Sequence, residues 1–191
     1  MAAGATATAA ARHGLFFAVY PDAGAAEQLA ALGRQLREHH KLAGRAFPAE
    51  RLHITLHHLG NHATLEPGLV TAARRAANGV RAAPFALTLD RVASFAHKPR
   101  NRPLVAHPRA DAGLDGLLAL QQALGEALQR EGLGRWVHER YTPHLTLLYD
   151  DTAVQLRPIE PVCFDVGRFA LMLSHLGRSR HEELASWPLN G

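Results

Sequence analysis

The chain has 191 residues, of which 47% are hydrophobic and 20% are charged, a balance that excludes a fibrous or disordered chain. No apolar run reaches the roughly 18 residues of a membrane span, and the single cysteine, Cys163, excludes an intramolecular disulfide. The formal net charge of +4 is carried mostly by arginine, whose planar guanidinium is suited to phosphate.

The predicted elements are, in chain order, strand 15–20, helix 25–40, strand 52–59, helix 67–78, strands 85–90 and 103–106, helix 111–130, strand 145–149, and strands 163–164 and 169–173. Asp22 is placed to cap the first helix, and Gly60 is expected to stop the second strand. The last helix is expected to bury one leucine-rich side: Leu114, Leu117, Leu118, Leu120, Leu124 and Leu128. Several strands adjoin without a helix between them, which favours an α+β fold with largely antiparallel sheets.

The domain organisation follows from what lies between these elements. Residues 1–13 are rich in alanine and lack the basic leader of a secretory signal, so they are expected to be a flexible extension. No linker divides the rest, and residues 14–191 are expected to form a single domain. We expect a monomeric, cytoplasmic protein that does not enter the membrane.

One short pattern occurs twice, as Leu52-His53-Ile54-Thr55-Leu56 and as Pro143-His144-Leu145-Thr146-Leu147. Side chains alternate between the two faces of a strand, so in each copy the histidine and the threonine share one face while the apolar residues take the other. If the two strands face each other, two imidazoles and two hydroxyls converge.

That set of groups is what the hydrolysis of a phosphodiester requires. A neutral imidazole can remove a proton from water while an imidazolium protonates the departing oxygen, and histidine suits both tasks because its usual pKa is about 6.5. Threonine hydroxyls can donate hydrogen bonds to the phosphoryl oxygens. A cyclic 2′,3′-phosphate is strained, so the reaction can proceed without a metal.

The chain resembles the two-histidine phosphoesterase superfamily, and most of all its bacterial 2′-5′ RNA ligase branch, also called RNA 2′,3′-cyclic phosphodiesterases. Both His-x-Thr-Leu motifs carry the resemblance, together with the strand that begins at Leu15 and the segments 173–177 and 187–189. The resemblance implies a bilobal, pseudo-symmetric fold in which two largely antiparallel sheets form a central cleft, with helices on the outside.

The resemblance also implies roles for residues. His53 is the expected proton donor, His144 the proton acceptor, and Thr55 and Thr146 the phosphate ligands, with no metal and no cofactor. The expected partners are RNA ends or nucleotides that carry a cyclic phosphate. Where the bacterial branch often has an arginine after the second motif, this chain has Tyr149, which we expect to hydrogen-bond to the substrate or stack on it.

Other histidines and basic residues leave alternatives open. His53, His57, His58 and His62 would suit a metal if they lay on a helix, but residues 54–56 favour a strand, and no glutamate follows His53 as a metalloprotease motif requires. Basic residues near the motifs or in the loop 96–102 are either phosphate contacts or ordinary surface charges: Arg51, Lys98, Arg100, Arg102 and Arg140.

Three functions are therefore considered. The leading hypothesis is an RNA 2′,3′-cyclic phosphodiesterase, and an additional 2′-5′ RNA ligase activity stays open. The second is a phosphodiesterase of small cyclic nucleotides or 2′-5′ oligoadenylates. The third is an RNA-binding module without turnover, against which the paired histidines speak because binding alone needs no acid–base pair.

Overall fold

In the computed structural model the described residues are 12–95, 99–178 and 180–190. Their elements are β1 (His13–Val19), α1 (Ala23–His39), η1 (Ala49–Arg51), β2 (Ile54–His62), α2 (Pro67–Asn78), β3 (Phe85–Ser94), β4 (Arg102–Pro108), α3 (Ala112–Arg130), η2 (Gly134–Trp136), β5 (Leu145–Asp150), β6 (Arg157–Val166), β7 (Arg168–His175) and β8 (Arg180–Pro188). The expected N-terminal extension lies, up to residue 11, outside the described residues.

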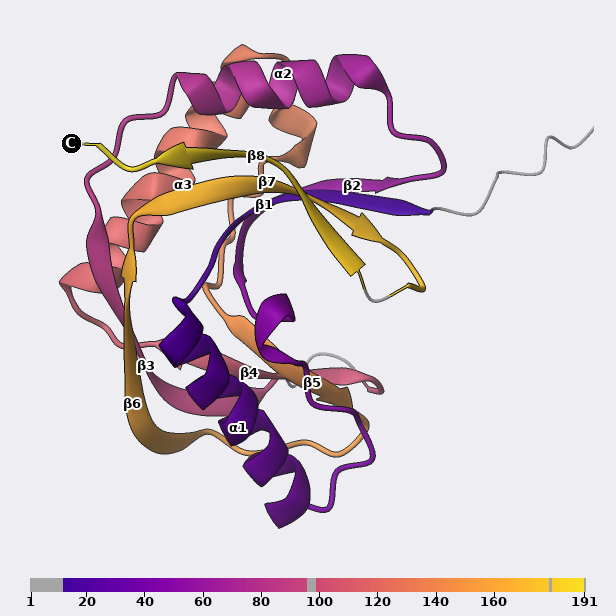
Figure 1. The fold of residues 1–191 in the computed structure, drawn as a ribbon, viewed down its shortest axis with the longest axis vertical. Helices are drawn as coiled ribbons and strands as arrows, with labels where there is room; N and C mark the ends of the chain where they lie inside the picture. The colour runs from indigo at the N-terminus through magenta and orange to yellow at the C-terminus, as the bar shows by residue number, and fades with distance from the viewer. Residues whose placement is uncertain (1–11, 96–98, 179, 191) are drawn as a thin grey trace, which may run out of the picture.

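The strands form a sheet in the order β6-β3-β4-β5-β2-β1-β7-β8, and each neighbouring pair is antiparallel. This confirms the α+β prediction with antiparallel strands. Instead of two separate sheets there is one, whose two halves are joined by a single residue pair, Ile54 of β2 with Leu145 of β5. Figure 1 shows the half with β1, β2, β7 and β8 above the half with β3, β4, β5 and β6.

The two halves of the sheet have matching internal order. Counted outward from the central pair, one half runs β2-β1-β7-β8 and the other β5-β4-β3-β6. The unit β1-α1-β2 therefore corresponds to β4-α3-β5, and each unit ends in one of the two motifs. The halves are not the two halves of the sequence, because β7 and β8 return to pair beside β1.

The helices cross from one half to the other. Helix α1 packs against β5 and β6, and α3 against β3 and β2, while α2 covers the outer side of the upper half (Figure 1). As predicted, the Asp22 carboxylate caps α1 by accepting a hydrogen bond from the backbone amide of Ala25 at 2.9 Å.

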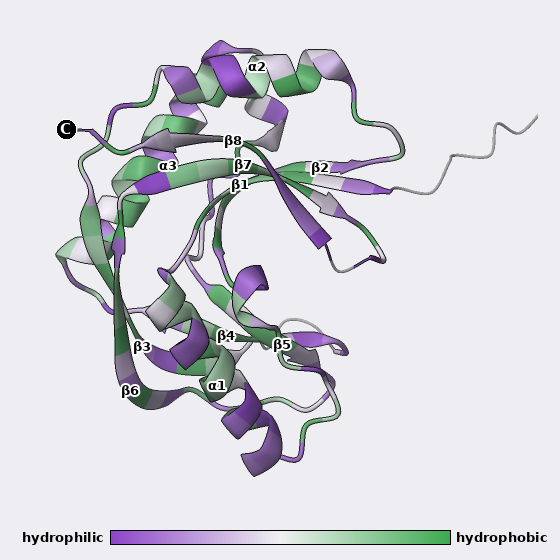
Figure 2. Ribbon diagram, in the orientation of Figure 1, coloured by the Kyte–Doolittle hydropathy of each residue, from purple (hydrophilic) through white to green (hydrophobic). Residues whose placement is uncertain are grey.

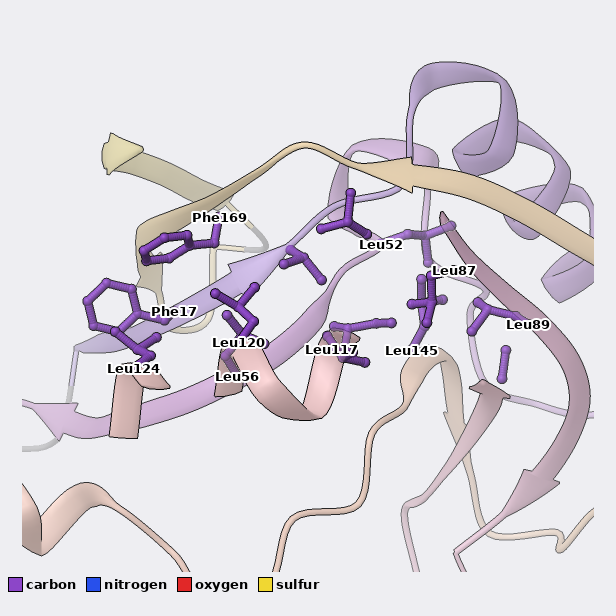
Figure 3. Close-up of a cluster of buried hydrophobic side chains, with 14 of the residues drawn as sticks. Phe17, Leu52, Leu56, Leu87, Leu89, Leu117, Leu120, Leu124, Leu145 and Phe169 are labelled. Atoms are coloured by element: carbon purple, nitrogen blue, oxygen red, sulfur yellow. The ribbon is translucent and has the colours of Figure 1, made fainter. Parts of the chain in front are cut away.

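The core lies between the sheet and α3. Leu117, Leu120, Leu124 and Leu128 are fully buried, and Figure 3 shows the first three pointing toward Leu56 and its buried neighbours. The prediction for Leu118 is wrong, because its side chain is 38% exposed. Leu118 follows Leu117 by one residue and so is turned by about 100° around the helix axis.

Strand β8 is missing from the prediction and β6 is longer than predicted. The β8 sequence is rich in charged residues, and Figure 2 colours much of the strand in purple and pale tones, in contrast to the largely green β7. What fixes β8 is Trp187, whose ring lies 5.4 Å from that of Phe169 and 6.0 Å from that of Phe17. Leu184 is the other large apolar side chain of β8 that packs against the core, and two such residues three positions apart leave no period-two signal.

Contrary to the prediction, Gly60 does not stop the second strand. Strand β2 continues to His62, and Gly60 has a φ of 92°, a backbone conformation that glycine adopts without strain. A Cβ at this position would lie 2.4 Å from Cη2 of Trp136. Glycine thus lets the Trp136 ring pack directly on the strand.

The basic loop is only partly described, because Lys98 lies outside the described residues. Arg102 is already engaged, since its guanidinium donates to the backbone carbonyl of Asp151, while Arg100 is exposed. None of the helices in the described part of the chain combines the length and the apolar character that a transmembrane span requires.

Candidate active site

The central pair of the sheet places the two motifs side by side. Ile54 and Leu145 are opposite one another, and each is 0% exposed. Continued one residue each way, this antiparallel register sets His53 against Thr146 and Thr55 against His144. Because neighbouring residues alternate faces, these four polar side chains share the face opposite Ile54 and Leu145. Thr55 and His144 line the same pocket, and the charge of His144 acts on His53. The two motifs therefore converge.

Both imidazoles are held in the same way. Nδ1 of His53 lies 2.7 Å from the carbonyl oxygen of Arg51, and Nδ1 of His144 lies 2.7 Å from that of Thr142. A carbonyl oxygen can only accept, so Nδ1 carries the hydrogen in each ring. Nε2 of each neutral imidazole is then left with a lone pair for proton transfer.

Aromatic rings surround His53. Phe16 of β1 stacks on it with centroids 4.9 Å apart and an interplanar angle of 29°, and Tyr20 lies at 5.8 Å. His181 of β8 approaches edge-on at 5.3 Å. Phe16 also belongs to a small buried cluster with Ala18, Ala170 and Met172. Phe16 and the apolar residues behind it therefore cover one side of the His53 ring and limit the access of water to it.

His144 has its own aromatic neighbour in the other half of the sheet. The Phe95 ring meets it edge-on at 4.8 Å and also lies 6.0 Å from His107 of β4. Burial lowers the pKa of His107, and the positive charge of His144 lowers it further. Each motif histidine thus has a second histidine close to it: His181 beside His53, and His107 beside His144.

Burial lowers the pKa of both motif histidines. For His53 the pKa falls to about 4, and the positive charges of His181, Arg51 and His144 add to burial, while the hydrogen bond to the Arg51 carbonyl opposes it. For His144 burial lowers the pKa and the Thr142 carbonyl opposes the change. In the free protein at pH 7 both rings are predominantly neutral.

The two threonines complete the group. Thr55 and Thr146 are half-buried, and neither hydroxyl makes a hydrogen bond within the described residues. The backbone carbonyl of Thr55 accepts a hydrogen bond of 3.0 Å from the Tyr141 hydroxyl, which ties the segment before β5 to β2. Both hydroxyls are therefore available to a ligand.

Tyr149 lies apart from this group. The pairing of β4 with β5 shifts register between Thr146 and Leu148, and both Leu147 and Leu148 are buried. The Tyr149 side chain is 38% exposed, with its ring 5.9 Å from that of Phe47. The structure brings together His53, Thr55, His144 and Thr146, and it places Tyr149 beside Phe47 instead.

A pocket of about 280 Å³ lies where β2 and the segment before β5 diverge. Thr55 and His144 line it together with Arg140, His138 and other residues of β2, α3 and the loop before β5. Of the two arginines near the motifs, Arg140 therefore borders the site. Arg51 lies on the other side, next to His53, and its guanidinium carbon is 4.2 Å from the centroid of the Phe47 ring.

The histidines considered as metal ligands do not gather. His57 is buried with Nε2 2.9 Å from the Gln121 carbonyl, and Nε2 of His62 lies 2.8 Å from that of Leu59. His58 is exposed on the opposite face from His57. Within residues 12–95, 99–178 and 180–190, no group of three or more potential metal ligands is found.

Sequence reasoning did not identify the residues that surround the histidines. Phe16 lies within the predicted strand 15–20, and no motif marks His107 and His181 among the 13 histidines. The structure places β1 and β4 in equivalent positions beside the motif strands, an order that no local sequence pattern records.

Comparison with known proteins gives a consistent result. Residues 20–178 match the family model of the 2′-5′ RNA ligase superfamily, and no curated protein sequence matches the chain. Escherichia coli LigT in its apo form is 28% identical and has a TM-score of 0.74, over 95% of this chain and 98% of LigT. The LigT complex with 3′-AMP is 29% identical with the same TM-score, over 95% and 99%. TT0787 of Thermus thermophilus, 23% identical over 93% of this chain and 98% of its own, shares the fold with a TM-score of 0.72. The family match spans both motifs and most of the chain, so this protein belongs to the 2′-5′ RNA ligase superfamily of two-histidine phosphoesterases.

Proposed function

We propose that the protein is a metal-independent RNA 2′,3′-cyclic phosphodiesterase that opens the cyclic phosphate to a phosphomonoester. The observation that carries the proposal is the matched pair of imidazoles, each anchored through Nδ1 at 2.7 Å and each with a free Nε2. Two such groups on one face can deliver and remove a proton in the same step. E. coli LigT, a relative, has been solved with 3′-AMP and with phosphate.

The proposed step is a displacement at phosphorus. Nε2 of His144 takes a proton from water as the water oxygen bonds to phosphorus. The bond from phosphorus to one ribose oxygen breaks, and Nε2 of His53 gives that oxygen a proton. The product is a ribose phosphomonoester beside a free hydroxyl, and the proton on His144 returns His53 to its starting form through solvent. The donor and acceptor roles follow the resemblance to the superfamily.

The threonines are assigned to the phosphate itself. Thr55 and Thr146 lie diagonally across the two strands, each opposite a histidine in the register fixed by Ile54 and Leu145. Their hydroxyls can donate to the non-bridging oxygens, on which charge accumulates as the water attacks. The same displacement, with the 5′-hydroxyl of a second RNA end in place of water, would form a bond from that oxygen to phosphorus and break the bond to the 3′ oxygen, which takes the proton from His53. The two RNA ends would then be joined through a 2′-5′ bond by means of the same groups.

The proton balance explains how a histidine with a low pKa can act as the donor. At a pKa of about 4, His53 is protonated in only about one free molecule in a thousand at pH 7. An anionic phosphate beside the ring favours the imidazolium and raises its pKa. The substrate therefore brings about the protonation that its own cleavage requires.

The test is a turnover assay with end-group analysis. RNA that ends in a 2′,3′-cyclic phosphate, the mononucleoside cyclic phosphates and 2′-5′ dinucleotides are incubated with the wild-type protein, with and without EDTA. We expect cyclic ends to become phosphomonoesters at the same rate in EDTA. Loss of activity in EDTA that zinc or manganese restores would overturn the metal-independent mechanism. Binding of RNA without any turnover would favour the RNA-binding module.

A further inference from the structure

Within the described residues, the guanidinium of Arg51 has no carboxylate partner. Within the described residues its side chain makes no ion pair, and its Nε is buried without a hydrogen bond. The guanidinium rests on the Phe47 ring, with 4.2 Å from its central carbon to the ring centroid. A buried polar group that lacks a partner costs free energy, so this position favours an anion that would supply the missing acceptor.

His181 presents a second unpaired nitrogen in the same place. Its ring lies 5.3 Å from His53 and 5.3 Å from Phe16, and its Nδ1 is also buried without a hydrogen bond. Burial and the charge of Arg51 lower the pKa of His181. Arg51 therefore lies close enough to act electrostatically on His181 as well as on His53.

No carboxylate balances these groups in the described structure. Glu183 of β8 acts on Tyr20, but its carboxylate is paired with Arg168 at 2.8 Å, and the Glu182 carboxylate is paired with His175 at 3.0 Å. Tyr20 adds a donor, because its hydroxyl is buried without a hydrogen bond and burial raises its pKa. Donors thus outnumber acceptors around His53 on this side.

The cluster formed by Arg51, His181 and Tyr20 is separate from the position of the scissile phosphate. The carbonyl of Arg51 lies 2.7 Å from Nδ1 of His53, and the ring of His181 lies 5.3 Å from that of His53, whereas the aromatic neighbour of His144 is Phe95 at 4.8 Å. The cluster therefore lies beside His53 on the side of β8, while the scissile phosphate belongs between His53 and His144. At the 3′ end of an RNA, the next anion is the phosphate on the 5′ oxygen of the same nucleotide.

We propose that Arg51 and His181 form a second anion subsite, which binds the phosphate on the 5′ side of the terminal nucleotide. This inference rests on the proposed function and adds a substrate class to it, namely RNA ends and 5′-phosphorylated nucleotides rather than bare nucleoside cyclic phosphates. Arg51 supplies a planar fork of donors to the phosphate, and His181 a further donor when it is protonated.

The experiment compares two substrates that differ only in the second phosphate. Adenosine 2′,3′-cyclic phosphate is assayed with a 5′-hydroxyl and with a 5′-phosphate, using the wild type, Arg51→Met and Arg51→Lys. Methionine keeps an apolar stem over Phe47 but loses the charge, and lysine keeps the charge but loses the fork. Arg34→Met, at an exposed position on α1, is the matched control for the loss of one charge.

The quantity that tests the subsite is the ratio of kcat/KM for the 5′-phosphorylated substrate to kcat/KM for the 5′-hydroxyl substrate. The wild type and Arg34→Met should have a kcat/KM roughly 10- to 100-fold higher for the 5′-phosphorylated substrate, the range for one or two charged hydrogen bonds. In Arg51→Met the ratio should fall to near one, with an intermediate value in Arg51→Lys. A wild-type ratio near one, or equal losses on both substrates in folded Arg51→Met, would overturn the subsite.

Binding separates the subsite from the proposed reaction. Calorimetric titration of the same variants with 3′-AMP and with adenosine 3′,5′-bisphosphate needs no turnover. The wild type should bind the bisphosphate more tightly by a similar factor, and Arg51→Met should lose the difference. If the wild type hydrolyses neither cyclic substrate, the proposed function fails, while equal affinities for the two ligands would overturn the subsite by itself.

Discussion

The pH dependence of kcat/KM tests the paired histidines directly, because the proposed mechanism requires one neutral and one protonated imidazole in the active form of the free protein. The positive charge of His144 contributes to the lowered pKa of His53, so kcat/KM reports the pair of rings and not either ring alone. As the pH rises, the doubly protonated pair loses its first proton near the His53 value of about 4 and its second at the pKa of His144, which burial lowers below 6.5.

These values set the window for activity. The singly protonated pair is most abundant between about pH 4 and the lowered pKa of His144, which lies below 6.5, and it declines about tenfold per pH unit above that pKa. We therefore expect a bell-shaped kcat/KM with its maximum below pH 6.5. In the bound state the anionic phosphate raises both pKa values, so the maximum of kcat should lie at higher pH than that of kcat/KM.

The assay is initial-rate hydrolysis of a 2′,3′-cyclic phosphate from pH 4 to 9, with the folded fraction measured at each point. That control is needed because the folded protein, with lowered histidine pKa values, binds fewer protons than the unfolded chain between about pH 4 and 6.5. Its stability consequently decreases as the pH falls through this window. A kcat/KM that rises steadily to pH 8, or a bell that persists in folded His144→Ala, would refute the reasoning.

Three sets of substitutions, at the threonines, the histidines and Tyr149, test the remaining assignments. Thr146→Val keeps the shape of the side chain but removes the hydroxyl, and kcat should fall roughly tenfold to a thousandfold through loss of one transition-state hydrogen bond. Thr55→Val should have a similar effect. Unchanged rates in the folded variants would mean that both threonines serve only as strand residues. His53→Ala and His144→Ala should each cost at least about 100-fold, and the double variant much less than the product of the two losses; melting temperatures on the same preparations identify any variant that is merely unstable. Tyr149→Phe should keep activity if the ring contact with Phe47 is what matters, whereas a loss equal to that of Tyr149→Ala would assign the role to the hydroxyl.

The candidate catalytic group was predictable because it depends on local periodicity. Alternation alone puts His53 with Thr55 and His144 with Thr146, and the repetition of the motif suggested that they meet. The position of Tyr149 was not predictable, because it depends on a register shift opposite β4 that no local pattern records. His181 was missed because β8 itself was missed, being held by pairing with β7 and by Trp187 rather than by an apolar pattern of its own.

The environment of the Arg51 side chain could not be predicted from the sequence for a different reason. An arginine two residues before a motif can equally point into solvent, and only the tertiary structure shows that it lies over Phe47 with an unpaired Nε. The Nδ1 anchors of the histidines are similar: the carbonyls of Arg51 and Thr142 are available in any sequence, but their positions depend on how the chain enters β2 and β5.

The single pair that joins the halves of the sheet also has a mechanical meaning. Within the described residues no other ladder pair links β2 to β5, so a rotation of one half of the sheet relative to the other would be centred near Ile54 and Leu145. Such a rotation displaces residues near its centre less than distant ones. His53 and His144, each one residue from that pair, would keep their spacing if the halves opened or closed. The outlying groups, Arg51 and Tyr149 among them, would move further. If the proposed function holds, such an arrangement would admit RNA ends of different bulk while the distance between the two imidazoles stayed nearly constant.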